Sequence, residues 1–190
     1  MTDLALESRD GLPDALRVLL DAYPRQGWSQ DPGFDGLIRF WLDRHLMFRR
    51  LLAEMHTGTA GLLDRQVDPR TFANQISRYG GMFVNGLHEH HTIEDTYYFP
   101  KLQAKDARVA RGFDILDADH HALDGHLAAF VDSANGVLTR LDDRDLVQDN
   151  AATFQAALGD MDRLLNRHLT DEEDLVVPVI MKFGSGDLGG

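Results

Sequence analysis

The sequence predicts an all-α protein: an up-down-up-down four-helix bundle that follows a short N-terminal helical extension. Four long segments repeat their apolar residues with the period of a helix, and no segment alternates as a strand would. Turn signals rich in Gly, Pro and Asp separate these segments. The 190 residues are enough for one domain with a substantial core.

Residues 1–34 are predicted to form the extension, with a short helix that ends at Tyr23-Pro24. The bundle is predicted over residues 35–183. The glycine-rich residues 184–190 are predicted to be a flexible tail.

The first long helix is predicted over residues 35–56, because Thr57-Gly58 is a typical stop signal. His45 lies in the middle of its apolar stripe. His56 lies near the end of this helix, three turns from His45, and is interpreted as a helix-end residue rather than a ligand.

The second helix is predicted over residues 68–104. Its apolar stripe includes His90 and, within about 60° of it, Glu94. His88 points almost opposite to His90, and His91 lies about a quarter-turn away. Both are therefore predicted to face solvent.

The third helix is predicted over residues 108–141 and carries His120 on its apolar face. His121 is the rival ligand, but His120 is favoured because both His121 and His126 point about 100–120° away from it; His126 is predicted to face solvent. Asp124 lies one turn beyond His120, at the border of the apolar face. The fourth helix is predicted over 146–182.

One motif occurs twice, in the second and the fourth helix. Both copies read His-x-x-x-Glu-[Asp/Glu]-x-x-x-x-Pro, once from His90 to Pro100 and once from His168 to Pro178. Residues four apart on a helix differ by only about 40° in azimuth, so each copy points an imidazole and a carboxylate at the same place. Two such pairs, aimed inward from different helices, can form a metal cage.

The four stripes together carry four histidines and two glutamates, which are costly to bury unless something pairs with them. Two cations about 3.5–4 Å apart and bridged by carboxylates use such a set naturally. Glu94 and Glu172 are predicted to bridge the cations, and the terminal ligands are His45, His90, His120 and His168. Nitrogen and oxygen donors without sulfur suit Fe or Mn best, with Zn possible. The alternative is a buried polar network that ties the helices together.

This pattern resembles the hemerythrin-like (HHE cation-binding) family over about residues 36–182. The matching residues are His45 within Arg-His-Leu-Met-Phe, His90-x-x-x-Glu94-Asp, His120 within Ala-Asp-His, and His168-x-x-x-Glu172-Glu. The resemblance implies two non-haem Fe ions, bridged by the two carboxylates and an oxo or hydroxo group. It also implies a protein that binds dioxygen, senses oxygen or redox state, or handles nitric oxide and iron supply.

One position departs from the oxygen-carrying hemerythrins, which place a second histidine four residues after the third-helix histidine. Asp124 stands there. The departure argues against reversible dioxygen carriage and resembles the stress-repair and nitric-oxide-handling branch. Asp124 is a seventh ligand, a hydrogen-bond partner of a ligand imidazole, or a surface residue. Tyr97 either donates a hydrogen bond to a bridging oxygen or a bound diatomic, or packs in the core.

Composition excludes several classes of protein. A net charge of −12 without any basic run argues against nucleic acid and anionic membrane surfaces as partners. No apolar run approaches the ~20 residues that span a bilayer, and no secretory signal is apparent. The absence of cysteine removes thiolate metal sites and disulfides. A cytoplasmic location is therefore expected.

The leading hypothesis is a hemerythrin-like di-iron protein. It would bind or process dioxygen, nitric oxide or peroxide, or handle iron under oxidative or nitrosative stress. Whether it is an enzyme stays open, as does its oligomeric state. The alternative is a non-catalytic helical binding module with a single structural metal (Zn, Mn or Fe) or none.

Overall fold

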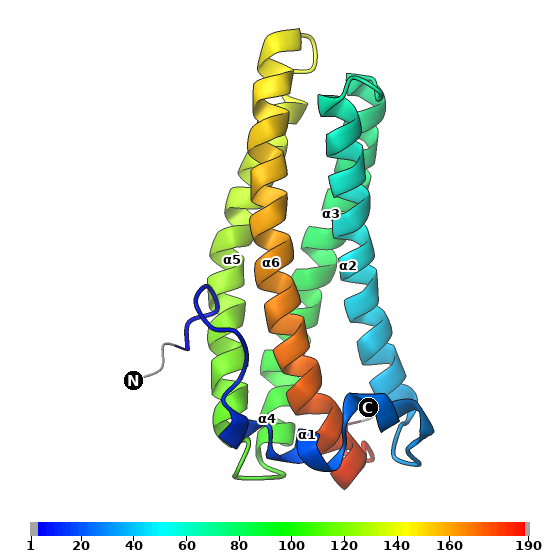
Figure 1. Cartoon of the computed structure of the whole chain (residues 1–190), viewed down its shortest axis with the longest axis vertical. Helices are drawn as coiled ribbons and strands as arrows, with labels where there is room; N and C mark the ends of the chain where they lie inside the picture. Colours follow the sequence, from blue (N-terminus) through cyan, green and yellow to red (C-terminus); the bar gives the residue numbers. More distant parts are fainter. Residues whose placement is uncertain (1–3, 189–190) are drawn as a thin grey trace. The chain divides into compact units, whose positions relative to one another are not determined.

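The computed structural model describes residues 4–188 and confirms the all-helical prediction, since these residues contain helices and no strand. The main helices pack as a bundle, and short helical pieces precede them (Figure 1). None of the helices in this range has the length and apolar composition that crossing a membrane requires.

The elements follow one another in a simple order. The N-terminal pieces are η1 (Asp14–Leu16), α1 (Val18–Ala22) and η2 (Arg25–Gln30). The long helices are α2 (Gly36–Leu63), α3 (Pro69–Ile93), α5 (Ala110–Leu138) and α6 (Arg144–Phe183). Between α3 and α5 lie a π-helical turn, η3 (Glu94–Tyr98), and the short α4 (Phe99–Gln103).

The chain forms two compact units. Unit 1 comprises Met1–Leu46, His90–His121 and Asn166–Gly190, and unit 2 comprises Met47–Glu89 and Ala122–Leu165. Each of the four long helices contributes a segment to each unit. The predicted boundaries of extension, bundle and tail stay a prediction, and residues 1–3 and 189–190 of the extension and tail lie outside the described residues.

Aspartates start three of the long helices. Oδ1 of Asp35, Asp68 and Asp143 each accepts hydrogen bonds of 3.0–3.2 Å from two backbone N–H groups in the first turn of α2, α3 and α6. These N–H groups have no partner inside the helix, so the caps stabilise the helix starts at positions given by the sequence.

Helix α2 is longer than predicted, because it continues through Thr57-Gly58 to Leu63. A Cβ at Gly58 would lie 2.7 Å from Oε1 of Gln75 on α3, so this glycine permits close packing and does not end the helix. The helix ends instead before Arg65, whose φ of 58° is the left-handed conformation common at helix C-termini.

Unit 2 has an aromatic core with one phenylalanine from each long helix. The rings of Phe48 and Phe83 lie 6.2 Å apart, those of Phe83 and Phe130 5.6 Å, and those of Phe130 and Phe154 5.3 Å. All four side chains are almost fully buried. This core is stabilised by the burial of apolar rings, which need no polar partner.

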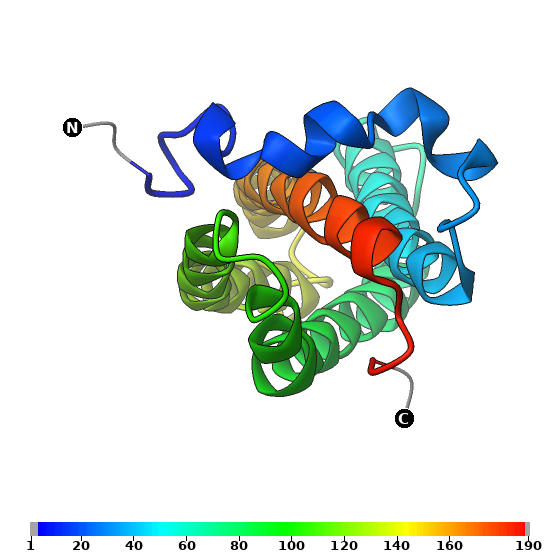
Figure 2. The same cartoon turned by 90° about the horizontal axis from the view of Figure 1, so that it is seen from below.

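Unit 1 has its own apolar core, to which the N-terminal pieces contribute Leu16 and Trp28. Figure 2 shows this N-terminal segment running beside the C-terminal part of α6. Gly112 on α5 lies so close to α6 that a Cβ there would be 2.8 Å from the Leu175 side chain. Leu188, within the predicted tail, is buried in the same core.

Candidate metal centre

The structure brings six predicted ligands together inside unit 1. They come from α2 (His45), α3 (His90), the π turn (Glu94), α5 (His120) and α6 (His168 and Glu172). Their exposed fractions lie between 0 and 7%. Five helical segments therefore converge on one water-excluded place with nitrogen and carboxylate donors only.

Four of these residues form a first set, called here the histidine–glutamate group: His45, His90, Glu94 and Glu172. Nε2 of His45 lies 3.0 Å from Nε2 of His90, which lies 3.0 Å from Oε1 of Glu94. Oε2 of Glu172 lies 3.4 Å from Nε2 of His45. One donor atom from each of the four residues lies within 4.8 Å of the others, which is close enough to surround one cation.

A second set, called the three-histidine group, consists of His91, His120 and His168. Nε2 of His120 lies 3.2 Å from Nε2 of His168. The ring of His91 stacks on that of His120, with centroids 3.9 Å apart and 10° between the planes. These donors also lie within 4.8 Å of one another, so unit 1 holds two adjacent groups of donors.

The two glutamates of the histidine–glutamate group also face the three-histidine group. Oε1 of Glu94 faces His90 at 3.0 Å, whereas Oε2 of the same carboxylate faces Nε2 of His120 at 3.5 Å. Oε2 of Glu172 lies 3.4 Å from Nε2 of His45 and 3.5 Å from Nε2 of His168. Each carboxylate is therefore placed to serve a cation in either group.

The prediction that His91 faces solvent is wrong, since only 6% of this residue is exposed. The other buried residues of α3, which include Phe72 and Leu87, lie between 0° and about +80° from His90. The buried face is thus centred between His90 and His91, and not on His90. If the angles on α3 had been measured from the centre of its apolar stripe, and not from His90, the stripe would have included His91.

Asp124, by contrast, is exposed and belongs to neither group. Most buried residues of α5, such as Asp119 and Leu123, lie on the other side of His120 from Asp124. The structure therefore favours the surface role among the alternatives for this aspartate. His121, the rival ligand on this helix, is exposed.

Three other histidines lie away from the two groups. His88 is exposed, as predicted, and His126 is half-buried although it was predicted to face solvent. His56 is half-buried, and Nε2 of Gln155 donates to its Nδ1 at 3.0 Å. His56 and His126 belong to unit 2, and neither is a member of the two donor groups.

The π turn changes which tyrosine follows Glu94 toward the core. Tyr97 packs beside Lys101, whose Nζ lies 3.5 Å from the ring centroid. Tyr98 instead packs its ring 4.8 Å from that of Trp41. Burial raises the pKa of Tyr98, and the charges of Tyr97 and Glu94 raise it further. One extra residue in the turn shifts the helical register, which regular 3.6-residue spacing cannot anticipate.

Carboxylates also hold the far side of three imidazoles. Nδ1 of His45 lies 3.0 Å from Glu173, Nδ1 of His120 lies 2.7 Å from Asp95, and Nδ1 of His168 lies 3.2 Å from Asp119. Such a partner fixes the ring orientation and leaves Nε2 free to bind a metal. The indole N–H of Trp41 donates to Oε1 of Glu172 in the same way, which orients that carboxylate.

Burial sets the protonation of several donors. It lowers the pKa of His90 to about 3 and that of His91 well below its usual range. Burial also lowers the pKa of His45, but the charge of Glu172 and bonds to Glu172 and Glu173 outweigh it, so the pKa rises to about 9.

The pKa values of the two glutamates are shifted in opposite directions. Burial and the charge of Glu172 raise the pKa of Glu94 well above its usual range. Burial acts the same way on Glu172, but the positive charge of His45 outweighs it and lowers the pKa of Glu172. Protons on His45 and Glu94 therefore neutralise part of the buried negative charge, as a bound cation would.

Several buried donor atoms have no hydrogen-bond partner: both carboxylate oxygens of Glu94, Oε2 of Glu172 and Nε2 of His91. A buried polar atom left without a partner costs about 1–3 kcal/mol. These four atoms belong to the two donor groups; elsewhere in the described residues, Nε of Arg17 and Oε1 of Gln155 are also buried without a partner. Buried electron-pair donors that face one another without hydrogen-bond partners fit metal cations well.

Comparison with curated proteins and with solved structures finds no significant match. The model of one protein family, the hemerythrin HHE cation binding domain, matches residues 36–180. This range covers most of the chain and includes every residue of both donor groups. The chain therefore belongs to the hemerythrin HHE cation-binding domain family.

Proposed function

We propose that unit 1 holds two cations, one in the histidine–glutamate group and one in the three-histidine group, with the two glutamates shared between them. The observation that carries this proposal is the position of Glu94. Its two oxygens face different groups, at 3.0 and 3.5 Å, and neither has a hydrogen-bond partner. A lone structural cation would leave one of these oxygens and the three-histidine group without a role.

The cations are proposed to be iron. The donors are imidazoles and carboxylates, and the chain contains no cysteine, which suits Fe or Mn and also permits Zn. Carboxylates behind His45, His120 and His168 raise the basicity of these ligands, as is typical of metal-bound histidines. The family membership points to a cation without naming it.

The proposed ligand is small: dioxygen, nitric oxide or peroxide. The donor residues are at most 7% exposed, which favours a small diatomic ligand over a bulky organic substrate. A pair of iron ions supplies redox chemistry toward such ligands. The chain itself orients the imidazoles, positions Glu172 through Trp41 and excludes water. Handling of iron under oxidative or nitrosative stress uses the same centre.

Anaerobic reconstitution with Fe(II), followed by elemental analysis, tests the proposal. We expect about two irons per chain, and, after oxidation, near-ultraviolet charge-transfer absorption of a ferric pair. Glu94→Ala should lower the iron content and abolish this absorption. The matched control is Asp124→Ala, an acidic residue that belongs to neither group. A wild-type chain that retains one iron or none would contradict the proposal.

Ligand binding and turnover need separate measurements. Adding nitric oxide or dioxygen to the reduced protein should change the absorption spectrum in wild type and not in Glu94→Ala. Steady-state consumption of peroxide or nitric oxide would then distinguish an enzyme from a carrier or a sensor. A spectrum that no small ligand perturbs would favour a structural metal site.

A further inference from the structure

A buried arginine of the N-terminal segment contacts the metal centre through one carboxylate. Arg9 is only 7% exposed. Its Nη1 donates to Oδ1 of Asp119 at 2.6 Å, and its Nη2 donates to Oδ2 of the same carboxylate. Oδ2 of Asp119 also lies 3.2 Å from Nδ1 of His168. Arg9 thus fixes the position of Asp119, and Asp119 in turn contacts the imidazole of His168 in the three-histidine group.

A second arginine of this segment makes the equivalent contact on the other group. Nη1 of Arg25 donates to Oε2 of Glu173 at 2.7 Å, and Oε1 of Glu173 lies 3.0 Å from Nδ1 of His45. Arg25 also donates to Asp174 at 2.6 Å and to the carbonyl of Thr170 at 2.9 Å. Each donor group therefore has one arginine behind it, and both lie outside the family match at residues 36–180.

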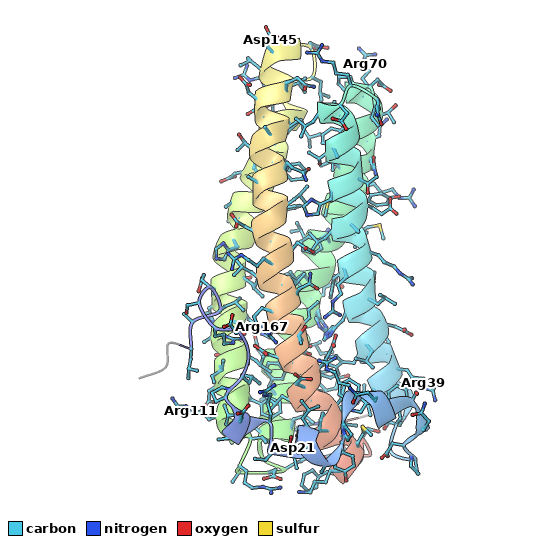
Figure 3. The ribbon with its side chains drawn as sticks, viewed as in Figure 1. Asp21, Arg39, Arg70, Arg111, Asp145 and Arg167 are labelled. Carbon is cyan, nitrogen blue, oxygen red and sulfur yellow. The ribbon has the colours of Figure 1, made fainter. Side chains whose placement is uncertain are left out.

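Further bonds hold the N-terminal segment against the ligand-bearing part of α6. Asp171 accepts from Nε of Arg9 at 2.9 Å and from the backbone N–H of Leu12 at 3.2 Å. Arg167, visible beside this segment in Figure 3, donates to the carbonyl of Asp10 at 2.5 Å. These contacts lie within one turn of His168 on either side, so the segment is attached where its position affects the ligands.

The physical role of these arginines follows from the carboxylates. Asp119 and Glu173 can orient an imidazole only if they stay ionised and in one rotamer. The planar guanidinium of arginine, which is always charged, holds a carboxylate by two parallel hydrogen bonds. Without Arg9, Asp119 would be a buried charge with no fixed cation, and it would turn toward other partners or take up a proton.

We propose that Arg9 and Arg25 are positioning residues of the metal centre, Arg9 for the cation of the three-histidine group and Arg25 for the cation of the histidine–glutamate group. This inference rests on the proposed function. According to this inference, the N-terminal segment helps to position the metal ligands, although it precedes the cation-binding domain in the chain.

The experiment compares Arg9→Gln, Arg25→Gln and the control Arg17→Gln in the full chain. Arg17 lies in the same segment and pairs with Asp14, whose side chain is 95% exposed. Metal-free protein is titrated with Co²⁺ or Zn²⁺ in competition with a chelator, which resolves two binding steps. We expect Arg9→Gln and Arg25→Gln each to weaken one step, by about 10–100-fold, and the control to weaken neither.

Melting temperatures separate positioning from general stability. They are measured without metal and at one buffered concentration of free Zn²⁺ for every variant. Positioning predicts that the rise in melting temperature caused by Zn²⁺ shrinks in both variants, because that rise depends on affinity. A merely structural role predicts a lower melting temperature with the rise unchanged. Arg9→Lys, which keeps the charge but loses the paired bonds, should recover only part of the affinity.

The outcomes distinguish this inference from the proposed function. If wild type binds two cations and both variants bind them with wild-type affinity, the inference is overturned and the function stands. If wild type binds none, the function itself fails. Should Arg9→Gln not fold, Arg25→Gln decides, because the side chain of Arg25 is 36% exposed and tolerates replacement better.

Discussion

The same four long helices build two opposite kinds of interior. In unit 2 each helix supplies one phenylalanine to a chain of ring contacts: Phe48, Phe83, Phe130 and Phe154. In unit 1 each helix supplies at least one histidine to the two donor groups. Both sets of side chains lie on the inward faces of the helices and both are buried.

The difference lies in what completes each interior. The phenylalanine layer is stabilised by burial alone, since its side chains carry no polar atom that needs a partner. The donor groups leave four polar atoms without hydrogen bonds. Among their side chains, the pKa of His45 is raised and that of His90 is lowered. Such donors are suited to binding cations, as proposed above. The following predictions test that contrast.

The largest effect of a single substitution on stability is expected in unit 2. Phe130→Ala should lower the free energy of unfolding by about 3–5 kcal/mol, because it leaves a cavity among packed rings. Urea unfolding of the metal-free protein, followed by circular dichroism, measures this change. Phe40→Ala, at a phenylalanine that is 60% exposed, is the control and should stay within about 0.5 kcal/mol. Loss of metal binding in folded Phe130→Ala would show that the two interiors are not separable.

Removal of the metal should affect unit 1 alone. At free metal 100-fold above Kd, binding contributes about 2.7 kcal/mol per cation, which chelation removes. Hydrogen exchange measured by mass spectrometry should accelerate in residues 90–98 and 166–174 after chelation. Exchange in residues 122–165 should change little. Equal acceleration in both regions would contradict a metal requirement confined to unit 1.

His91→Leu should separate stability from metal binding. The metal-free protein is expected to gain about 1–3 kcal/mol, because a buried nitrogen without a partner is replaced by an apolar side chain. One of the two cations should bind more weakly. Urea unfolding and a Zn²⁺ titration measure the two effects, with the exposed His88→Leu as control. Lower metal-free stability with unchanged affinity would assign His91 to the core.

Metal affinity should rise with pH up to about pH 9. The folded metal-free protein keeps a proton on His45 because its pKa is raised to about 9, and a cation must displace that proton. Below a pH of 9 the affinity should therefore fall by up to about tenfold per pH unit for this one proton. Competition with a chelator of known pH dependence measures it. His45→Gln, which cannot carry the proton, should flatten the slope.

The smallest expected changes in stability come from replacing one glycine in each unit by alanine. Gly81 on α3, in unit 2, is exposed, and an added Cβ meets no atom within 4 Å, so Gly81→Ala should stabilise by about 0.5–1 kcal/mol. Gly112→Ala in unit 1 should destabilise instead, since its Cβ would lie 2.8 Å from the buried Leu175. Melting temperatures test both signs, and stabilisation by both alanines would mean that α5 and α6 have room to separate.

Much of the fold and of the site follows from sequence periodicity. The period of the apolar residues predicts the four long helices, and aspartates mark the start of three of them. His90 with Glu94 and His168 with Glu172 lie on the same side of a helix because residues four apart always do. The helix period is a local property of the backbone, so no knowledge of neighbouring helices is needed to obtain these pairs.

Only the packing of helices decided the rest. The inward direction of α3 is set by α5 and α6, so His91 is buried against His120 although its azimuth differs from that of His90. The same effect leaves Asp124 exposed. The bonds from Arg9 to Asp119 and from Arg25 to Glu173 join residues more than a hundred positions apart. Periodicity along one helix contains no information about such contacts, because they depend on where another segment is placed.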